Sequence, residues 1–315
     1  MDINYLLWLQ DFRNAIHDSW TPFMMFASSF AVRYLFLIPV FIYWCVNKRK
    51  GLYTLAAFHI CIAINAFIKL TACVYRPWIK DARVIPAGNA IATAPDYSFP
   101  SGHTATATPL YGGMAVGFWD NKKTKWLSVL CVIAILITGF SRNYLGVHTP
   151  QDVFVGLSLG IFILWVTHVL FNYLTAHPEK EDWFLLGGVL LTVLALVYVT
   201  FKSYPMDYVD GKLLVDPQHM MRSSYKDIAS LGLFCIARYI EKRWVRFQPL
   251  GLNVKGILLS LAGLILGIIL LVFLRKPCTD WLGALWGRVL HQGILINYFI
   301  LIFPVVISFF QPKKD

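Results

Sequence analysis

The sequence predicts an all-α, polytopic helical membrane protein with about nine transmembrane helices, and three observations support this fold class. The 315-residue chain is 57% hydrophobic and 16% aromatic, and only 14% of its residues are charged. Its mean hydropathy of +0.60 leaves too little polar surface for a soluble domain of this size. The apolar residues also gather into long runs that are separated by short polar segments.

The chain divides into an N-terminal segment and two groups of spans. Residues 1–20 mix charged and large apolar side chains, which is typical of an interfacial amphipathic helix rather than a cleavable signal peptide. A core group of spans is expected within residues 22–174 and an additional C-terminal group within residues 183–310. Because no internal repeat or low-complexity tract separates them, residues 1–315 are expected to form one integral membrane domain.

Apolar runs give the individual spans, which are expected at residues 22–45, 52–74, 101–119, 126–140, 150–174, 183–201, 228–240, 254–274 and 290–310. The run 228–240 is short, but a crossing there places Lys242, Arg243 and Arg246 on the same side as the basic loops at residues 47–50 and 120–125. The positive-inside rule then predicts an outer N-terminus and a cytoplasmic C-terminus. Short loops with few cysteines favour a bacterial plasma membrane.

The net charge of +11 could suggest a nucleic-acid partner, but the basic residues lie in short clusters beside apolar spans and form no binding face. No nucleic-acid binding is therefore expected. The six cysteines show neither metal-ligand nor disulfide spacing and are interpreted as small hydrophobic residues.

The first polar cluster lies at the outer end of the second expected span and consists of Lys69 and Arg76-Pro77. Both cations can reach one ligand at that end of the helix. An ionisable group inside a span costs on the order of 3 kcal/mol, so Lys69 needs a reason to be there. The alternative to anion binding is that Lys69 extends to the membrane interface. Residues 78–99, which follow, are expected to form an outer loop that covers the site.

Pro100-Ser101-Gly102-His103 opens the third expected span. Gly102 lets the backbone approach a ligand closely, and the first amide groups of the helix, at Ser101, Gly102 and His103, are donors at a positive helix end. An anion is favoured there, and His103 could give a proton to a leaving oxygen. The alternative is a helix-opening turn that carries an interfacial histidine.

The third cluster runs from Ser141-Arg142 to His148 and Asp152. Thr149-Pro150 followed by Asp152 predicts a capping box at a helix start, which needs no catalysis. His148 precedes Asp152 by four residues, however, so the carboxylate could hold one imidazole nitrogen and leave the other free as a nucleophile. Lys69, Arg76 and Arg142 together supply charge that stabilises a transferring phosphoryl group. The remaining polar groups within spans are expected to be satisfied helix-packing residues: His59, Asn65, His168, His291 and Asn297.

The three clusters resemble the signature motifs of the phosphatidic acid phosphatase type 2 superfamily, KxxxxxxRP, PSGH and SRxxxxxHxxxD. They stand here, in order, as Lys69 to Arg76-Pro77, Pro100 to His103, and Ser141-Arg142 to His148 and Asp152. The resemblance implies a metal-independent phosphatase without a cofactor, in which His148 attacks phosphorus, Asp152 orients it and His103 protonates the leaving group. It also implies a set of phosphate-binding residues, namely Lys69, Arg76, Ser101, Gly102 and Arg142.

The order of spans departs from the common lipid phosphatases of this superfamily, which have about six spans and carry the first motif after the third. Here the motif follows the second span, a layout similar to glucose-6-phosphatase and the sphingosine-1-phosphate phosphatases. Vanadium haloperoxidases share the motifs but are soluble. A lipid phosphate or diphosphate, such as phosphatidic acid, an isoprenyl diphosphate or a sphingoid phosphate, is the expected substrate because the site lies near the bilayer interface, and a sugar phosphate is the second possibility. A transporter or a non-catalytic lipid-phosphate binder would use the same cations without catalysis.

Overall fold

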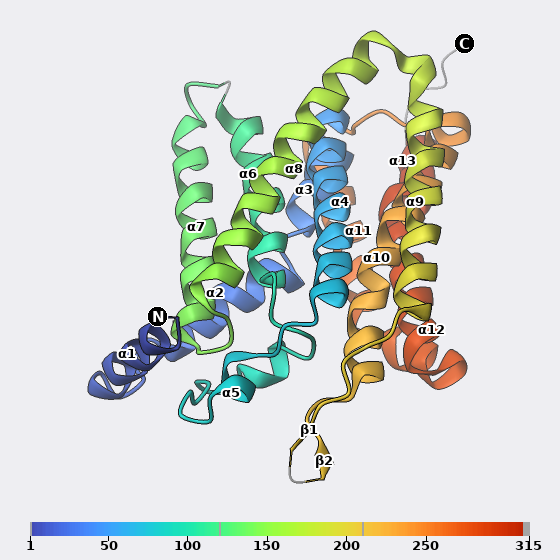
Figure 1. Cartoon of the computed structure of the whole chain (residues 1–315). Coiled ribbons are helices and arrows are strands. Elements are labelled where there is room, and N and C mark those ends of the chain that lie inside the picture. Colours follow the sequence, from blue (N-terminus) through green and yellow to red (C-terminus); the bar gives the residue numbers. More distant parts are fainter. Residues whose placement is uncertain (1, 120, 210, 311–315) are drawn as a thin grey trace.

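The computed structural model describes residues 2–119, 121–209 and 211–310, and this part of the chain is almost entirely helical (Figure 1). Its strands are limited to a hairpin of β1 (Tyr208–Val209) and β2 (Lys212–Leu213). The α-helices in order are α1 Asp2–Ala15, α2 Thr21–Arg33, α3 Leu37–Phe41, α4 Lys48–Ala72, α5 Pro77–Lys80, α6 Gly102–Trp119, α7 Lys125–Tyr144, α8 Pro150–Ala176, α9 Glu181–Phe201, α10 Pro217–Ile240, α11 Val254–Phe273, α12 Arg275–Asn297 and α13 Phe303–Phe309. The expected all-α class is confirmed.

Several of these helices can cross a bilayer, which makes the chain a multi-pass integral membrane protein. Within the described ranges, seven helical stretches are long and apolar enough: Thr21–Val46, Lys48–Lys80, Lys125–Tyr144, Pro150–Ala176, Pro178–Phe201, Val254–Phe273 and Arg275–Phe309. They coincide with seven of the expected spans. The other two expected spans correspond to α6 and α10, which pack inside the bundle against α4 (Figure 1). The count of nine therefore stays a prediction.

Three helix boundaries differ from those expected. Helix α12 begins at Arg275, although the last apolar run starts at residue 290. Helix α7 continues to Tyr144, so Ser141 and Arg142 lie in its last turn instead of in the following loop. Helix α10 begins at Pro217, well before the apolar run at 228–240. The Asp216 side chain accepts a hydrogen bond from the Gln218 amide at 2.9 Å, and proline is favoured at the first helical position. The start signal at Asp216-Pro217 lies outside the apolar run, so the apolar pattern alone does not predict it.

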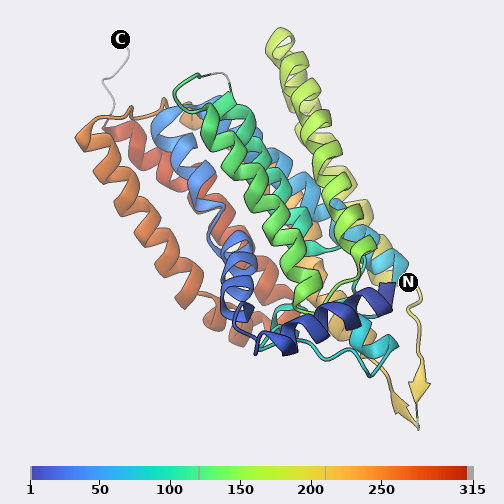
Figure 2. The same ribbon diagram turned by 90° about the vertical axis from the view of Figure 1, so that its left-hand side faces the viewer.

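Helix α1 lies across one end of the bundle rather than along it (Figure 2), as an interfacial helix would. Arg13 fixes it there. Its guanidinium donates to the Tyr144 carbonyl at 3.2 Å and to the Ile85 carbonyl at 2.7 Å. The N-terminal helix is thereby attached to the end of α7 and to the loop after α5.

The basic connections meet at the opposite end of the bundle. Lys48 pairs with Glu241 at 2.6 Å, and Lys50 donates to the Gly117 carbonyl at 2.8 Å. The connection between α8 and α9 lies at this end too (Figure 1). The structure therefore gathers on one end the loops that the charge pattern predicts to be cytoplasmic. The C-terminal residues 311–315 lie outside the described residues.

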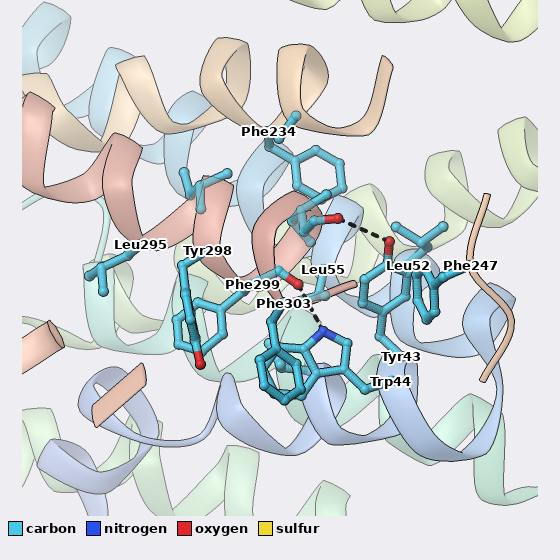
Figure 3. Close-up of a cluster of buried hydrophobic side chains, with 14 of the residues drawn as sticks. Tyr43, Trp44, Leu52, Leu55, Phe234, Phe247, Leu295, Tyr298, Phe299 and Phe303 are labelled. Carbon is cyan, nitrogen blue, oxygen red and sulfur yellow. Dashed lines mark hydrogen bonds between the residues drawn. The ribbon is translucent and has the colours of Figure 1, made fainter. Parts of the chain in front are cut away.

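An aromatic cluster joins the first span to the last one (Figure 3). The Trp44 indole donates to the Phe299 carbonyl at 2.9 Å, and the Tyr43 hydroxyl donates to the Ile300 carbonyl at 3.4 Å. Both carbonyls belong to a π-helical turn, Tyr298–Ile302, whose altered bonding pattern makes backbone acceptors available to side chains. The C-terminal spans are thus joined to the core group at this cluster.

Candidate active site

The cations of the first motif reach the same acceptor from different elements. Lys69 is in the last turns of α4, and the chain leaves this helix through Cys73, which has a left-handed backbone conformation with φ of 50°. Arg76 follows as the N-cap residue of α5. The Asp96 carboxylate then lies 3.4 Å from Lys69 Nζ and 2.6 Å from Arg76 Nη2. Lys69 also donates to the Tyr97 carbonyl at 2.7 Å and is only 3% exposed, so it does not extend to water.

The loop between α5 and α6 covers the site, as expected, and it also contributes two side chains to it. Asp96 binds the two cations of the first motif. Ser98 donates to Asp152 Oδ2 at 2.5 Å and lies 3.5 Å from His148 Nδ1. This loop has no periodic pattern of apolar residues, so the sequence does not predict that either residue faces the site.

His148 is buried, at 1% exposed, between an acidic and a basic partner. Its Nδ1 lies 3.3 Å from Asp152 Oδ2, and its Nε2 lies 2.8 Å from Arg76 Nη1. An arginine can only donate, so Nε2 must be the acceptor and Nδ1 carries the proton toward Asp152. The nitrogen that is available for nucleophilic attack therefore faces the cations of the first motif.

The carboxylate of Asp152 has two structural tasks. It accepts the Thr149 amide at 2.9 Å, while the Thr149 hydroxyl accepts the Asp152 amide at 3.3 Å, and these two bonds complete the expected capping box. The same oxygen, Oδ2, is the atom near His148. Capping and orientation of the imidazole thus coexist in one side chain.

The second motif lies directly against the third. The Ser101 amide donates to the Asp152 carbonyl at 2.9 Å, so the expectation that it is a free donor was wrong. The amides of Gly102 and His103, in the first turn of α6, have no partner among the described residues. They remain the donors that this helix end can offer to an anion.

His103 and Arg142 complete the group. His103 lies in the first turn of α6, just after Ser101, whose amide donates to the Asp152 carbonyl, and Arg76 donates to His148. Residues of the three motifs are therefore brought together. Arg142 is fully buried and donates to Ser28 Oγ at 3.1 Å and to Thr93 Oγ1 at 3.0 Å. Its Nε has no partner within the described ranges, which leaves a buried donor available.

One polar residue that was expected to be satisfied by helix packing is not. Asn65 is 4% exposed, and its Nδ2 has no hydrogen-bond partner among the described residues. It lies one turn before Lys69 on α4, and its Oδ1 is 3.7 Å from the position that a Cβ on Gly102 would occupy. An unpaired amide beside the first turn of α6 is a further donor next to the site. The other four such residues do have partners, namely His59, His168, His291 and Asn297.

Burial and neighbouring charges set the protonation states of His148 and Asp96. Burial and the charge of Arg76 lower the pKa of His148 to about 3, although Asp152 acts in the opposite direction. The imidazole is therefore neutral at ordinary pH, as a nucleophile requires. Burial alone would raise the pKa of Asp96, but Lys69 and Arg76 lower it to about 2. An ionised carboxylate thus occupies two cations that could otherwise bind phosphate.

We expect Asp96→Asn to lower the inhibition constant of inorganic phosphate roughly 5- to 10-fold, because the neutral amide no longer competes for Lys69 and Arg76. Product inhibition measured on purified enzyme would check this. Asp81→Asn is the matched control, since Asp81 pairs with the exposed Arg83 in the same loop. A higher inhibition constant in Asp96→Asn would show that Asp96 organises Arg76 instead of competing with phosphate.

Residues 50–176 match the family model described as PAP2 superfamily. Phosphatidylglycerophosphatase B of Bacillus subtilis is 31% identical over 146 residues, which cover 44% of this chain and 67% of the relative. Undecaprenyl-diphosphatase BcrC of the same organism is 32% identical over 157 residues, covering 48% and 72%. Undecaprenyl-diphosphatase of Sulfolobus acidocaldarius is 29% identical over 161 residues, covering 50% and 72%.

No solved structure matches the chain significantly. A helical bundle of this kind, together with these relatives, defines an integral membrane phosphatase, a hydrolase of phosphoric esters. The chain belongs to the PAP2 superfamily. Helices α9 to α13 lie beyond the matched residues.

Proposed function

We propose that this phosphatase hydrolyses a lipid phosphate or diphosphate through a phosphohistidine on His148. The observation that carries the proposal is the position of the imidazole, which is buried between Asp152 and Arg76 with Nε2 toward the cations. Such an arrangement provides an oriented, neutral nucleophile beside charge that can hold a phosphoryl group.

In the first step, Nε2 of His148 attacks phosphorus as the bond to the leaving oxygen breaks. His103 gives its proton to that oxygen, and Asp152 stabilises the imidazole through Nδ1. The phosphoryl oxygens bind Lys69, Arg76 and Arg142, whose charge matches the transition state. Ser101 and Gly102 belong to the same site. Because the Ser101 amide donates to the Asp152 carbonyl, we assign the amides of Gly102 and His103 as the backbone donors to phosphate.

In the second step, water attacks the phosphohistidine and His103 accepts a proton from it. The nitrogen–phosphorus bond breaks, inorganic phosphate leaves, and His148 returns to its neutral form. We also assign Asn65 a contact with the bound phosphate or the leaving oxygen, because its buried Nδ2 has no other partner among the described residues.

A lipid substrate is supported by the position of the site and by the names of the relatives. The site residues lie at helix ends, with Lys69 in the last turns of α4, His103 in the first turn of α6 and Arg142 in the last turn of α7. Helix α1 is attached to that end of α7 and crosses the end of the bundle (Figure 2). Relatives are named phosphatidylglycerophosphatase and undecaprenyl-diphosphatase. We infer that the headgroup reaches the site from the outer leaflet, with the N-terminus outside, while the hydrocarbon chain stays in the membrane.

A substrate panel in mixed micelles tests this assignment, with phosphatidic acid, undecaprenyl diphosphate and glucose 6-phosphate compared at matched concentrations. We expect kcat/KM for at least one lipid to exceed that for glucose 6-phosphate about 100-fold or more, because burial of a hydrocarbon chain contributes about 0.8 kcal/mol per CH₂. A preference for glucose 6-phosphate would assign the chain to soluble sugar phosphates instead.

The proposed reaction needs no metal ion, because arginine and lysine side chains supply the positive charge. We therefore expect the activity to stay within about twofold after incubation with EDTA and removal of the chelator. Activity that is lost with EDTA and recovered when Mg²⁺ or Zn²⁺ is restored would contradict the mechanism.

A further inference from the structure

A large apolar groove lies between α4, α8, α9 and α10, away from the candidate active site. Its volume is about 1200 Å³. This exceeds the roughly 300–1,000 Å³ that is usual for small-molecule sites. Its middle is lined by aliphatic side chains such as Ile60, Leu191 and Leu231. Helices α9 and α10 lie beyond the residues that match the family model, so the groove is built jointly by the core group and the C-terminal group.

The groove and the candidate active site lie on different sides of α4. Phe67 lines the groove, whereas Lys69 binds Asp96 and Tyr97. Two residues along a helix differ in direction by roughly 200°. The groove is thus not the phosphate site, and α4 separates the two.

The dimensions of the groove match those of a lipid. Its lining on α4 begins at Lys48 and ends at Phe67. At 1.5 Å per residue this stretch is about 28 Å long, close to the ~30 Å thickness of a hydrocarbon core. Helices α8 and α9, which diverge from their connection (Figure 1), both line the groove, for example with Leu174 on α8 and Leu194 on α9. A hydrocarbon chain fits such a space better than water, because the middle of the lining is mostly aliphatic and the Thr192 hydroxyl there already donates to the Gly188 carbonyl.

Charged side chains line only the end where the basic connections meet, namely Lys48, Arg49, Glu181 and Arg238. Two of the three cations already have carboxylate partners, since Lys48 binds Glu241 and Arg238 binds Glu181. Arg49 is different: among the described residues, its guanidinium donates only to the neutral Asn172 Oδ1 at 3.0 Å and to the Phe171 carbonyl at 3.5 Å. It is exposed and has donors left for an anion.

We propose that this groove binds one anionic phospholipid from the leaflet at which Arg49 lies. The phosphate sits on the Arg49 guanidinium, which suits a bidentate contact, and the hydrocarbon chains lie between α4 and α9. The lipid joins the C-terminal group of spans to the core group. By the charge distribution that leaflet is the cytoplasmic one, opposite the leaflet from which the proposed substrate enters.

Two glycines of α9 show where the proposal can be tested. A Cβ on Gly188 would lie 2.7 Å from Cys235 Sγ, so Gly188 is needed for packing against α10. A Cβ on Gly187 meets no atom within 4 Å, and Gly187 lines the groove. A large side chain at Gly187 fills the groove without displacing a packed neighbour, and replacing a helical glycine does not weaken the helix.

The experiment compares wild type, Gly187→Trp and Leu186→Trp, each purified in detergent, by mass spectrometry of bound phospholipid and by thermal stability with added lipid. Phosphatidylglycerol and phosphatidylcholine are the probes. Both are phosphodiesters and are therefore not substrates of the proposed hydrolysis of a lipid phosphate or diphosphate. Leu186 is exposed and does not line the groove, so it is the control. We expect wild type and Leu186→Trp to retain lipid and to be stabilised by phosphatidylglycerol, and Gly187→Trp to lose both effects.

Arg49→Gln should lower the affinity for phosphatidylglycerol about fivefold and leave that for phosphatidylcholine unchanged. If Gly187→Trp does not fold, Gly187→Leu serves in its place. Equal lipid content in the glycine variant and wild type would overturn the proposal, as would equal stabilisation of wild type by the two lipids. If Gly187→Trp raised the KM for a lipid phosphate and left the content of bound lipid unchanged, the groove would hold the hydrocarbon chain of the substrate. This result would also overturn the proposal.

Discussion

His148→Ala is expected to lower kcat by on the order of 10⁴-fold or more while leaving the binding of inorganic phosphate within a few-fold of wild type. The imidazole supplies the attacking nitrogen, so its loss removes the covalent route altogether. Binding persists because Lys69, Arg76 and Arg142 remain in place. Steady-state hydrolysis and a direct binding assay on the same preparation would measure the two effects separately.

The control for this variant is His168→Ala. His168 is exposed on α8 and contacts Asn172 at 2.9 Å, so its removal should leave turnover unchanged. An alanine variant at His148 that binds phosphate and still turns over like wild type would reject the enzyme mechanism. It would favour a protein that holds a phosphorylated headgroup for binding or transport.

Asp152→Asn is expected to lower kcat about 10⁴-fold with a loss of about 1 kcal/mol or less in the free energy of unfolding. The amide oxygen can take the place of Oδ2 and still accept the Thr149 amide, so the cap is kept. The same oxygen then faces His148 Nδ1 as a neutral acceptor, and the negative charge that stabilises the imidazole during attack is lost. Kinetics and thermal unfolding in detergent would measure the two consequences.

Thr149→Ala provides the opposite case. The substitution removes the Thr149 hydroxyl, which lies 3.3 Å from the Asp152 amide and forms the other half of the capping box. It leaves the contact between Asp152 and His148 in place. We expect a loss of ~1 kcal/mol in stability with kcat within about twofold of wild type. If Asp152→Asn and Thr149→Ala instead lost stability and activity in parallel, Asp152 would act only as a cap.

The sequence predicted the fold class and the residues of the three motifs because each lies at a helix end that an apolar run makes visible. Lys69, His103 and Asp152 stand at such ends. The capping box was predictable for the same reason, since its residues are adjacent in sequence. The contact between Ser101 and Asp152 was not, because it joins two helix starts that only the packing of α6 on α8 brings together.

The partners of the motif cations could not be found in this way. Asp96 and Ser98 lie in a loop without periodicity, and nothing in the chain marks them as facing the site. Asn65 was expected to have hydrogen-bond partners because most polar side chains in spans do. Only the structure shows that its side-chain amide has no partner among the described residues. The start of α10 was misplaced because its first turns are polar, although Asp216-Pro217 would have indicated it.

The most direct measurement is rapid-quench trapping of the enzyme with a phosphate-labelled lipid substrate, followed by mass spectrometry of the peptides. We predict acid-labile, alkali-stable label on His148 that forms and decays at rates compatible with turnover and is absent from His148→Ala. A full pre-steady-state burst of product without label on that imidazole, or label on any other residue, would contradict the covalent mechanism.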